Sequence, residues 1–401
     1  MMIGNLALGG AEWAFVRQAN ALASANHQVT CYVPYYCDSS SALFAALDQR
    51  IQIVTFGWMT DFLHRVLYKL TLVFPRINLE QRLHSAFLKR LNRRNRFDVV
   101  NPHLHIATVV ACQAFMNDPV PIIETDHGDY ALLLQDDPPF RRLSIPLQRV
   151  DALICPSSTN QNRIAQLPWS SRFRSSVIPY SYESPSARID RALPQDDIFT
   201  FGMVSRGVPE KGWEEAIEAF RAVRLSSTRP MRLILVGGSS YLQALERDLE
   251  PDLKTDVIFV GSQPDIRPWI ECFDVGLLPS YFAAESLPNV IIECLAQGKP
   301  VIATDIGGIP DMLDTVGQTC GILVPLNASS HRADLAQLTA AMQRLLDDSS
   351  LLKLLAQNAI VKVRRYRPEV VVNALVSFFD SVRVSMQHSS KATLAPSPTL
   401  L

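Results

Sequence analysis

The sequence lacks several features that would assign it to a large class of proteins. No apolar run reaches the ~20 residues that a helix needs to span a bilayer. Residues 1–10 have neither the basic start nor the long apolar stretch of a secretion signal. The 7 cysteines are scattered and form no Cys-x-x-Cys pair, which argues against a disulfide framework and a zinc site. A formal net charge of -1 gives no general attraction to nucleic acid. We therefore expect a cytoplasmic protein without a nucleic-acid partner.

Two motifs of cofactor-dependent enzymes are also missing. The Gly-Gly-Ser sequence at 237–239 follows a predicted strand but does not form the G-x-G-x-x-G pattern, so we do not expect a nicotinamide dinucleotide. No Asp-x-Asp motif follows a predicted strand, and we therefore expect neither a catalytic metal nor a cofactor.

What the sequence does contain is a repeated alternation of strands and helices over 401 residues, a length that suits two domains. Such alternation predicts parallel α/β sheets. We expect an N-terminal Rossmann-like domain over 1–182, a polar linker over 183–197 and a second Rossmann-like domain over 198–366. The C-terminal helix, about 367–386, is expected to pack back on the first domain, and 387–401 to be a disordered tail rich in Ser, Pro and Thr.

The most informative stretch runs from Glu285 to Pro300 and contains a second glutamate, Glu293. It follows an apolar strand over 274–279. Pro288 suits the first turn of a helix and Ser286 suits its cap, while Gly298 suits the position just past its end. The N–H groups of the helix start are then free to bind an anion. These groups belong to Leu287, Pro288, Asn289 and Val290, although proline itself has none. An anion site between two carboxylates suits a nucleotide sugar.

This stretch resembles the C-terminal signature of the retaining glycosyltransferases of family 4. That signature is Glu-x7-Glu ahead of an Ala-x-Gly-x-Pro-Val turn, here Glu285 to Glu293 followed by 296–301. The resemblance implies the GT-B fold, in which two doubly wound Rossmann-like domains face each other across a cleft. It also implies that Glu293 binds the ribose of the donor and that Glu285 faces the donor sugar. No catalytic nucleophile is implied by either residue.

Three other segments carry the same resemblance. Arg206 and Lys211 lie in a segment similar to the family's Gly-Arg-x4-Lys-Gly, although Ser205 stands where glycine is usual. The resemblance implies that both clamp the diphosphate, where positive charge stabilises the leaving group. Gly9 and Gly10 are similar to the family's N-terminal phosphate loop. His127 matches a histidine that contacts the donor sugar in many members; its alternative is a structural histidine at the end of a strand.

The resulting expectation is a retaining, metal-independent hexosyltransferase that uses a UDP-, GDP- or ADP-hexose. Its acceptor is expected to be a saccharide or a lipid-linked molecule, in cell-surface polysaccharide or glycolipid synthesis. Two alternatives remain open: a sugar-nucleotide epimerase of the same fold, and a non-catalytic scaffold that binds sugar nucleotides.

A basic stretch over 63–96 suggests a further partner. It carries nine basic residues and one acidic residue, with leucine and phenylalanine among them. Such a pattern is typical of a surface that binds anionic lipid. We expect peripheral binding at the inner face of the membrane. The alternative is a solvated pair of helices whose apolar side packs on the N-terminal sheet.

Overall fold

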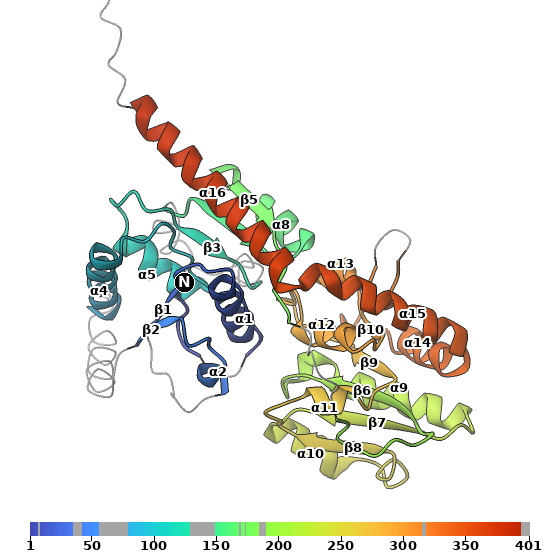
Figure 1. Cartoon of the computed structure of the whole chain (residues 1–401). Coiled ribbons are helices and arrows are strands. Elements are labelled where there is room, and N and C mark those ends of the chain that lie inside the picture. The colour runs from blue at the N-terminus through green and yellow to red at the C-terminus, as the bar shows by residue number, and fades with distance from the viewer. Residues whose placement is uncertain are drawn as a thin grey trace, which may run out of the picture. The chain divides into compact units, whose positions relative to one another are not determined.

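The computed structural model describes residues 1–6, 9–34, 42–55, 79–128, 149–167, 170–172, 174–183, 190–314 and 318–393. The chain divides into two compact units (Figure 1). The N-terminal unit comprises 1–181 and 368–401, and the C-terminal unit comprises 182–367.

The N-terminal unit is built on a parallel sheet. Its strands are β1 Thr30–Val33, β2 Gln52–Thr55, β3 Ile123–Thr125, β4 Ala152–Cys155 and β5 Arg174–Val177. Single bridges join Met2 to β1 and to Pro102, and join the segment 100–103 to 122–125. The strands therefore lie in the order β2, β1, Met2, 100–103, β3, β4, β5. In order along the chain this is 3-2-1-4-5-6-7, the arrangement of a doubly wound Rossmann sheet.

Helices cover both faces of this sheet, because successive strand residues point to opposite sides. Met2 and Tyr32 belong to the core under α4 (Leu79–Asn95) and α5 (His105–Ala114), while Ile3 and Cys31 belong to the core under α1 (Gly10–Ser24). The helices of this unit are α1 Gly10–Ser24, α2 Ala42–Ala45, α4 Leu79–Asn95, α5 His105–Ala114, α8 Ser158–Ala165 and α16 Pro368–Thr393, with the short 3-10 turn η1 Ser170–Arg172.

The C-terminal unit has a six-stranded parallel sheet in the order β11, β10, β9, β6, β7, β8. Its strands are β6 Phe199–Val204, β7 Met231–Val236, β8 Val257–Gly261, β9 Val275–Leu278, β10 Val301–Thr304 and β11 Gly321–Val324. Its helices are η2 Pro209–Lys211, α9 Trp213–Ser226, α10 Ser240–Asp248, α11 Arg267–Ile270, α12 Asn289–Ala296, α13 Ile309–Leu313, α14 Leu335–Asp347, α15 Ser349–Lys362 and η3 Val363–Tyr366. The chain order reverses between β6 and β9, and this is again the Rossmann arrangement.

Segments at the unit boundaries differ in part from the sequence-based expectation. Where the structure describes the predicted linker after residue 189, it packs on the C-terminal unit: Ala192 N–H donates to the Pro268 carbonyl at 3.0 Å, and Asp196 pairs with Arg232 at 2.7 Å. Residues 184–189 lie outside the described part.

The C-terminal helix α16 packs on the N-terminal unit through Val371, Val372, Leu375 and Val382. It continues to Thr393, so the expected disorder is wrong for 387–393. This segment has no glycine or proline to end a helix, and the first proline is Pro396. Residues 394–401 lie outside the described part.

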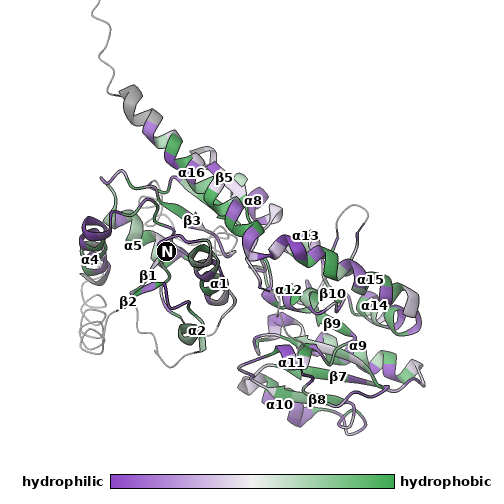
Figure 2. Cartoon of the chain, viewed as in Figure 1, coloured by the Kyte–Doolittle hydropathy of each residue, from purple (hydrophilic) through white to green (hydrophobic). Residues whose placement is uncertain are grey.

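Helix α4 contains most of the described part of the basic stretch. Leu88 is buried, and Phe87 and Leu91 pack with it on the core of the N-terminal unit. The exposed positions include Arg82, Lys89, Arg90, Arg93 and Arg94, and hydrophilic residues dominate this helix in Figure 2. The apolar side of α4 is thus occupied by the protein core, which agrees with the alternative for this helix. The predicted residues 63–78 lie outside the described part.

None of the described helices is both long enough and apolar enough to cross a bilayer.

Candidate active site

The predicted phosphate-binding residues lie where the strand order of the C-terminal unit reverses. Strand β6 ends at Val204 and is followed by Arg206, while its neighbour β9 ends at Leu278 and is followed by the loop that carries Glu285. In open parallel sheets, ligands bind at the carboxyl ends of the strands at such a reversal. The topology therefore brings the two predicted motifs to the position where a ligand is expected.

A buried ion pair joins these two motifs. Lys211 Nζ lies 2.6 Å from Glu285 Oε2, and the two side chains are only 8% and 7% exposed. The Ser280 hydroxyl donates to the same carboxylate oxygen at 2.7 Å. A charged hydrogen bond of this kind is strong, and each partner would be costly to bury alone. The pair thus fixes the positions of both side chains at the end of the sheet.

Two glycines allow the backbone to hold this pair. Gly212 has φ +84°, and a Cβ on it would collide with the carbonyl oxygen of Pro279. Gly307 has φ +54°, and a Cβ on it would collide with the carbonyl oxygen of Glu285. Both positions combine a left-handed backbone with a close approach, so only glycine fits without strain.

Arg206 and Lys211 are brought together over one aromatic ring. The Arg206 guanidinium carbon lies 5.4 Å from the centre of the Phe282 ring, and Lys211 Nζ lies 4.8 Å from it. The negative face of the ring attracts both cations. Trp213 Nε1 donates to the Arg206 carbonyl at 3.0 Å, which fixes the backbone there. Arg206 is exposed while Lys211 is buried, so Arg206 is the cation open to an incoming anion.

The helix after Glu285 begins later than the sequence suggests. Pro288 is the N-cap of α12, with φ -64° and ψ 118°, and its side chain provides no cap. The expectation that Ser286 caps the helix and that Pro288 lies in its first turn is therefore wrong, because the chain stays extended through Pro288. Asn289 and Val290 open the helix, whereas Leu287 precedes it. Gly298, with φ +67°, follows the end of the helix as expected.

Glu293 lies in the second turn of α12 and is 8% exposed. Its charge acts on Arg267, the first residue of α11. The pKa of Arg267 is raised mainly by its hydrogen bond with Asp265, and the charge of Glu293 adds to this rise. The structure therefore places Glu293 near a second cation, on an element different from that of Glu285.

Gly9 and Gly10 lie at the start of α1 in the N-terminal unit. Gly9 is the N-cap, and its φ of -159° is an extended conformation that any residue can adopt. A Cβ on Gly9 would instead collide with the carboxylate of Glu12, three residues along the chain. Glycine thus leaves room for this carboxylate to lie over the start of the helix.

His127 follows β3 and is 9% exposed. Its Nε2 lies 2.9 Å from Nδ1 of His103, and its Nδ1 lies 2.8 Å from the Tyr180 hydroxyl. Burial lowers the pKa of His127 to about 3, so the ring is neutral at physiological pH. Both ring nitrogens have protein partners, and His127 is therefore part of a buried polar network.

Several residues of these two sites were not predicted from the sequence: Ser280, Phe282, Asn101, His103 and Tyr180. Ser280 and Phe282 follow β9 directly, and Asn101 and His103 lie at the end of an expected strand. Polar residues at the carboxyl ends of parallel strands were the signal that could have identified them.

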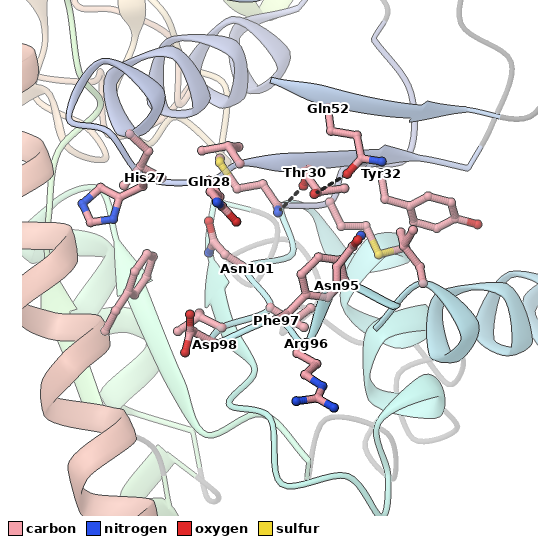
Figure 3. Close-up of a pocket in the computed structure, with 18 of the residues that line it drawn as sticks. His27, Gln28, Thr30, Tyr32, Gln52, Asn95, Arg96, Phe97, Asp98 and Asn101 are labelled. Atoms are coloured by element: carbon pink, nitrogen blue, oxygen red, sulfur yellow. Dashed lines mark hydrogen bonds between the residues drawn. The ribbon is translucent and has the colours of Figure 1, made fainter. Parts of the chain in front are cut away.

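A separate pocket of about 660 Å³ lies in the N-terminal unit (Figure 3). Its lining includes Thr30, Gln52, Phe97 and Asp98, and none of the predicted site residues. Thr30 is the first residue of β1, so the pocket lies at the amino ends of the strands. This edge is opposite to the one where ligands of such sheets bind.

In the part of the chain that the structure describes, no group of three or more His, Cys, Asp or Glu side chains could hold a metal ion.

Two family models match the chain. Residues 8–180 match the model described as Glycosyltransferase Family 4, and residues 197–348 match the one described as Glycosyl transferases group 1.

Curated relatives are just under 30% identical to the chain over the residues that align. A 2-deoxystreptamine glucosyltransferase of Streptomyces kanamyceticus is 29% identical over 180 residues, 43% of this chain and 44% of the relative. A D-inositol 3-phosphate glycosyltransferase of Acidothermus cellulolyticus is 28% identical over 75% of this chain and 70% of the relative. The chain spans less than half of the length of the first of these relatives.

Two solved structures share the fold. A sucrose-phosphate synthase of Thermosynechococcus elongatus superposes with a TM-score of 0.71 and 19% identity, over 96% of this chain and 98% of that one. HepE of Anabaena in complex with UDP-glucose superposes with a TM-score of 0.67 and 18% identity, over 95% of this chain and 99% of that one. HepE in complex with UDP superposes with a TM-score of 0.68, over 95% of this chain and 98% of that one. These similarities establish the GT-B fold for the chain.

The buried ion pair leads to a prediction about stability. Lys211→Met should lower the free energy of unfolding by about 3–5 kcal/mol, because it leaves a buried carboxylate without its cation. The double variant Lys211→Met/Glu285→Gln should lose less, since no charge is then left buried. Urea unfolding of the wild type, of Lys211→Met, of Glu285→Gln and of the double variant measures these free energies.

A matched control is the exposed pair of Arg221 and Glu250, whose side chains are 46% and 47% exposed. Single substitutions there should change the free energy of unfolding by less than about 1 kcal/mol. Additive losses at Lys211 and Glu285 would contradict a coupled buried pair.

Proposed function

The chain belongs to glycosyltransferase family 4, and from this membership we propose that it is a retaining hexosyltransferase. The proposed donor is a UDP-, GDP- or ADP-hexose, and the proposed acceptor is a saccharide or a lipid-linked molecule. The product would enter a cell-surface polysaccharide or glycolipid. A lipopolysaccharide core glycosyltransferase of Rhizobium meliloti, 28% identical over 58% of this chain, supports this pathway.

The observation that carries the proposal is the group of Arg206, Lys211 and Glu285 at the strand reversal of the C-terminal unit. Two cations next to the expected position of a diphosphate would stabilise the charge that develops as the glycosidic bond breaks. The buried carboxylate holds Lys211 in place and lies beside it, so it would face the sugar that the diphosphate carries.

In this proposal Glu293 binds the ribose and Glu285 the hexose. Gly9 and Gly10 let the backbone of the N-terminal unit approach the diphosphate, and His127 contacts the donor sugar. Because solved relatives are described in complex with UDP and with UDP-glucose, UDP-glucose is the first donor to test.

The experiment is a donor assay that follows both release of UDP and the fate of the hexose. Transfer to an acceptor, or slow hydrolysis in its absence, supports the proposal. Conversion of the donor to its epimer without release of UDP would identify an epimerase instead. Tight binding of donors without any turnover would identify a scaffold.

Substitutions should separate chemistry from binding. Arg206→Ala should lower kcat about a hundredfold, since one lost charge contact in the transition state is worth roughly 3 kcal/mol. Glu293→Ala should mainly weaken binding of the nucleoside diphosphate, because ribose contacts persist from ground state to transition state. Calorimetric titration of UDP and steady-state rates measure the two effects. Glu285→Ala should lower turnover more than it changes the affinity for UDP. An equal loss of UDP affinity in Glu285→Ala and Glu293→Ala would contradict this division of roles.

We also propose that catalysis needs no divalent metal, because Arg206 and Lys211 supply the positive charge beside the diphosphate. Turnover should therefore be unchanged after dialysis against EDTA. Loss of turnover that Mg²⁺ or Mn²⁺ restores would overturn this proposal.

The last proposal is peripheral binding to anionic membranes through the exposed basic side of α4. Each cation near an anionic surface contributes about 1 kcal/mol. Because the apolar side of α4 packs on the core, this binding would be electrostatic and would be lost in high salt.

Replacing Arg90, Arg93, Arg94 and Arg96 by serine should abolish sedimentation with vesicles that contain phosphatidylserine, and should leave donor hydrolysis intact. The control variant replaces four exposed basic residues of the C-terminal unit, Arg247, Lys254, Arg344 and Lys353. Equal sedimentation of the two variants would contradict a specific role for α4.

A further inference from the structure

A chain of hydrogen bonds runs behind His127 in the core of the N-terminal unit. It links Tyr180, His127, His103 and Asn101 through contacts of 2.8, 2.9 and 3.0 Å. His103 is fully buried, and Asn101 is 2% exposed. The three side chains after Tyr180 come from two segments that follow each other in the sheet order, at the carboxyl ends of their strands.

The direction of this chain is fixed at its inner end. Asn101 Nδ2 donates to the carbonyl oxygen of Ile123 at 2.6 Å, and a carbonyl can only accept. This contact assigns the two ends of the amide, so Asn101 Oδ1 is the acceptor on the other side. Gln18 Nε2 donates to the same Oδ1 at 3.0 Å, in agreement with this assignment.

The remaining protons follow in order. Because Asn101 Oδ1 accepts, His103 Nε2 must carry a proton and donate it. Burial, followed by the neighbouring His127, holds the pKa of His103 well below its usual range, so the ring is neutral and its Nδ1 accepts. His127 Nε2 must then donate to His103 Nδ1. The neutral His127 ring has no second proton, so the Tyr180 hydroxyl donates to His127 Nδ1.

We infer that His103 is a positioning residue that holds His127 in the Nε2–H form. His127 then offers a ligand a hydrogen-bond acceptor, its Nδ1 lone pair, which becomes available when Tyr180 turns its hydroxyl away. The matching group on a ligand is a hydroxyl that donates, such as a hydroxyl of the donor sugar. This inference rests on the proposed role of His127 at the donor.

The form of His127 can be measured without any donor. Long-range ¹H–¹⁵N correlation spectra of the full chain with labelled histidine, at neutral pH, should show His127 protonated at Nε2 and unprotonated at Nδ1. Spectra of His127→Asn assign the signals. A His127 signal protonated at Nδ1, or at both nitrogens, would overturn the inference.

Two variants of His103 test its positioning role. His103→Leu removes the acceptor for His127, while His103→Asn keeps an oxygen acceptor at the position of Nδ1. In His103→Leu the His127 signals should shift to a mixture of the two neutral forms, and kcat/KM for UDP-glucose hydrolysis should fall about tenfold, or about 1.4 kcal/mol. His103→Asn should restore both readouts. The affinity for free UDP should be unchanged in both variants, since the nucleotide is assigned to the C-terminal unit.

The outcomes separate this inference from the proposed function. A wild type with His127 in the Nε2–H form that neither hydrolyses nor transfers any donor would remove the proposed function and with it the ligand assignment. An active wild type whose His103→Leu variant folds and keeps its rate would remove the positioning role alone. Should His103→Leu fail to fold, the spectra of the wild type and of His103→Asn still decide the form of His127.

Discussion

The geometry of the candidate active site depends on one buried ion pair. Lys211 and Glu285 come from loops after two neighbouring strands, and neither charge is stable in that position without the other. Four neighbouring groups support this contact: the Ser280 hydroxyl on the carboxylate, the Phe282 ring beside the ammonium group, and the glycines at 212 and 307 that let the backbones approach. A site built in this way is preorganised before any ligand arrives.

In the N-terminal unit, buried polar side chains are also held in fixed positions, but by contacts between neutral groups. There a buried chain of hydrogen bonds runs from Asn101 through two histidines to Tyr180 and fixes which ring nitrogen of each histidine carries the proton. A neutral chain avoids the desolvation cost of burying charge, yet each member must be paired. The two units therefore offer different chemistry: cations suited to phosphate in one, and neutral acceptors suited to hydroxyl groups in the other.

The sequence predicted much of this arrangement where a local rule applied. Strand and helix alternation predicted the fold class, and Gly298 was expected to follow the helix that the structure shows as α12. Local rules failed at the start of α12. Ser286 and Pro288 suit a cap and a first turn, but the backbone stays extended through Pro288, which is itself the N-cap. Strand β5 is an example of an element without a local signal, because it begins with polar, exposed residues that show no apolar pattern.

Long-range contacts could not be predicted in the same way. No spacing in the sequence links Lys211 to Ser280, or His127 to Tyr180, because these partners meet only when the parallel strands are aligned. Which nitrogen of His127 carries the proton is harder still to predict, because it also depends on which end of the Asn101 amide faces Ile123.

Because α16 packs on the N-terminal unit, the two units are completed during synthesis in the reverse of the order in which they begin. The N-terminal unit is not continuous in sequence, because its core includes Val371, Val372 and Leu375. On the ribosome, residues 182–367 emerge and can fold as a unit before those side chains appear. The unit that begins first is thus completed last, and until then its surface for α16 stays open to chaperones and proteases.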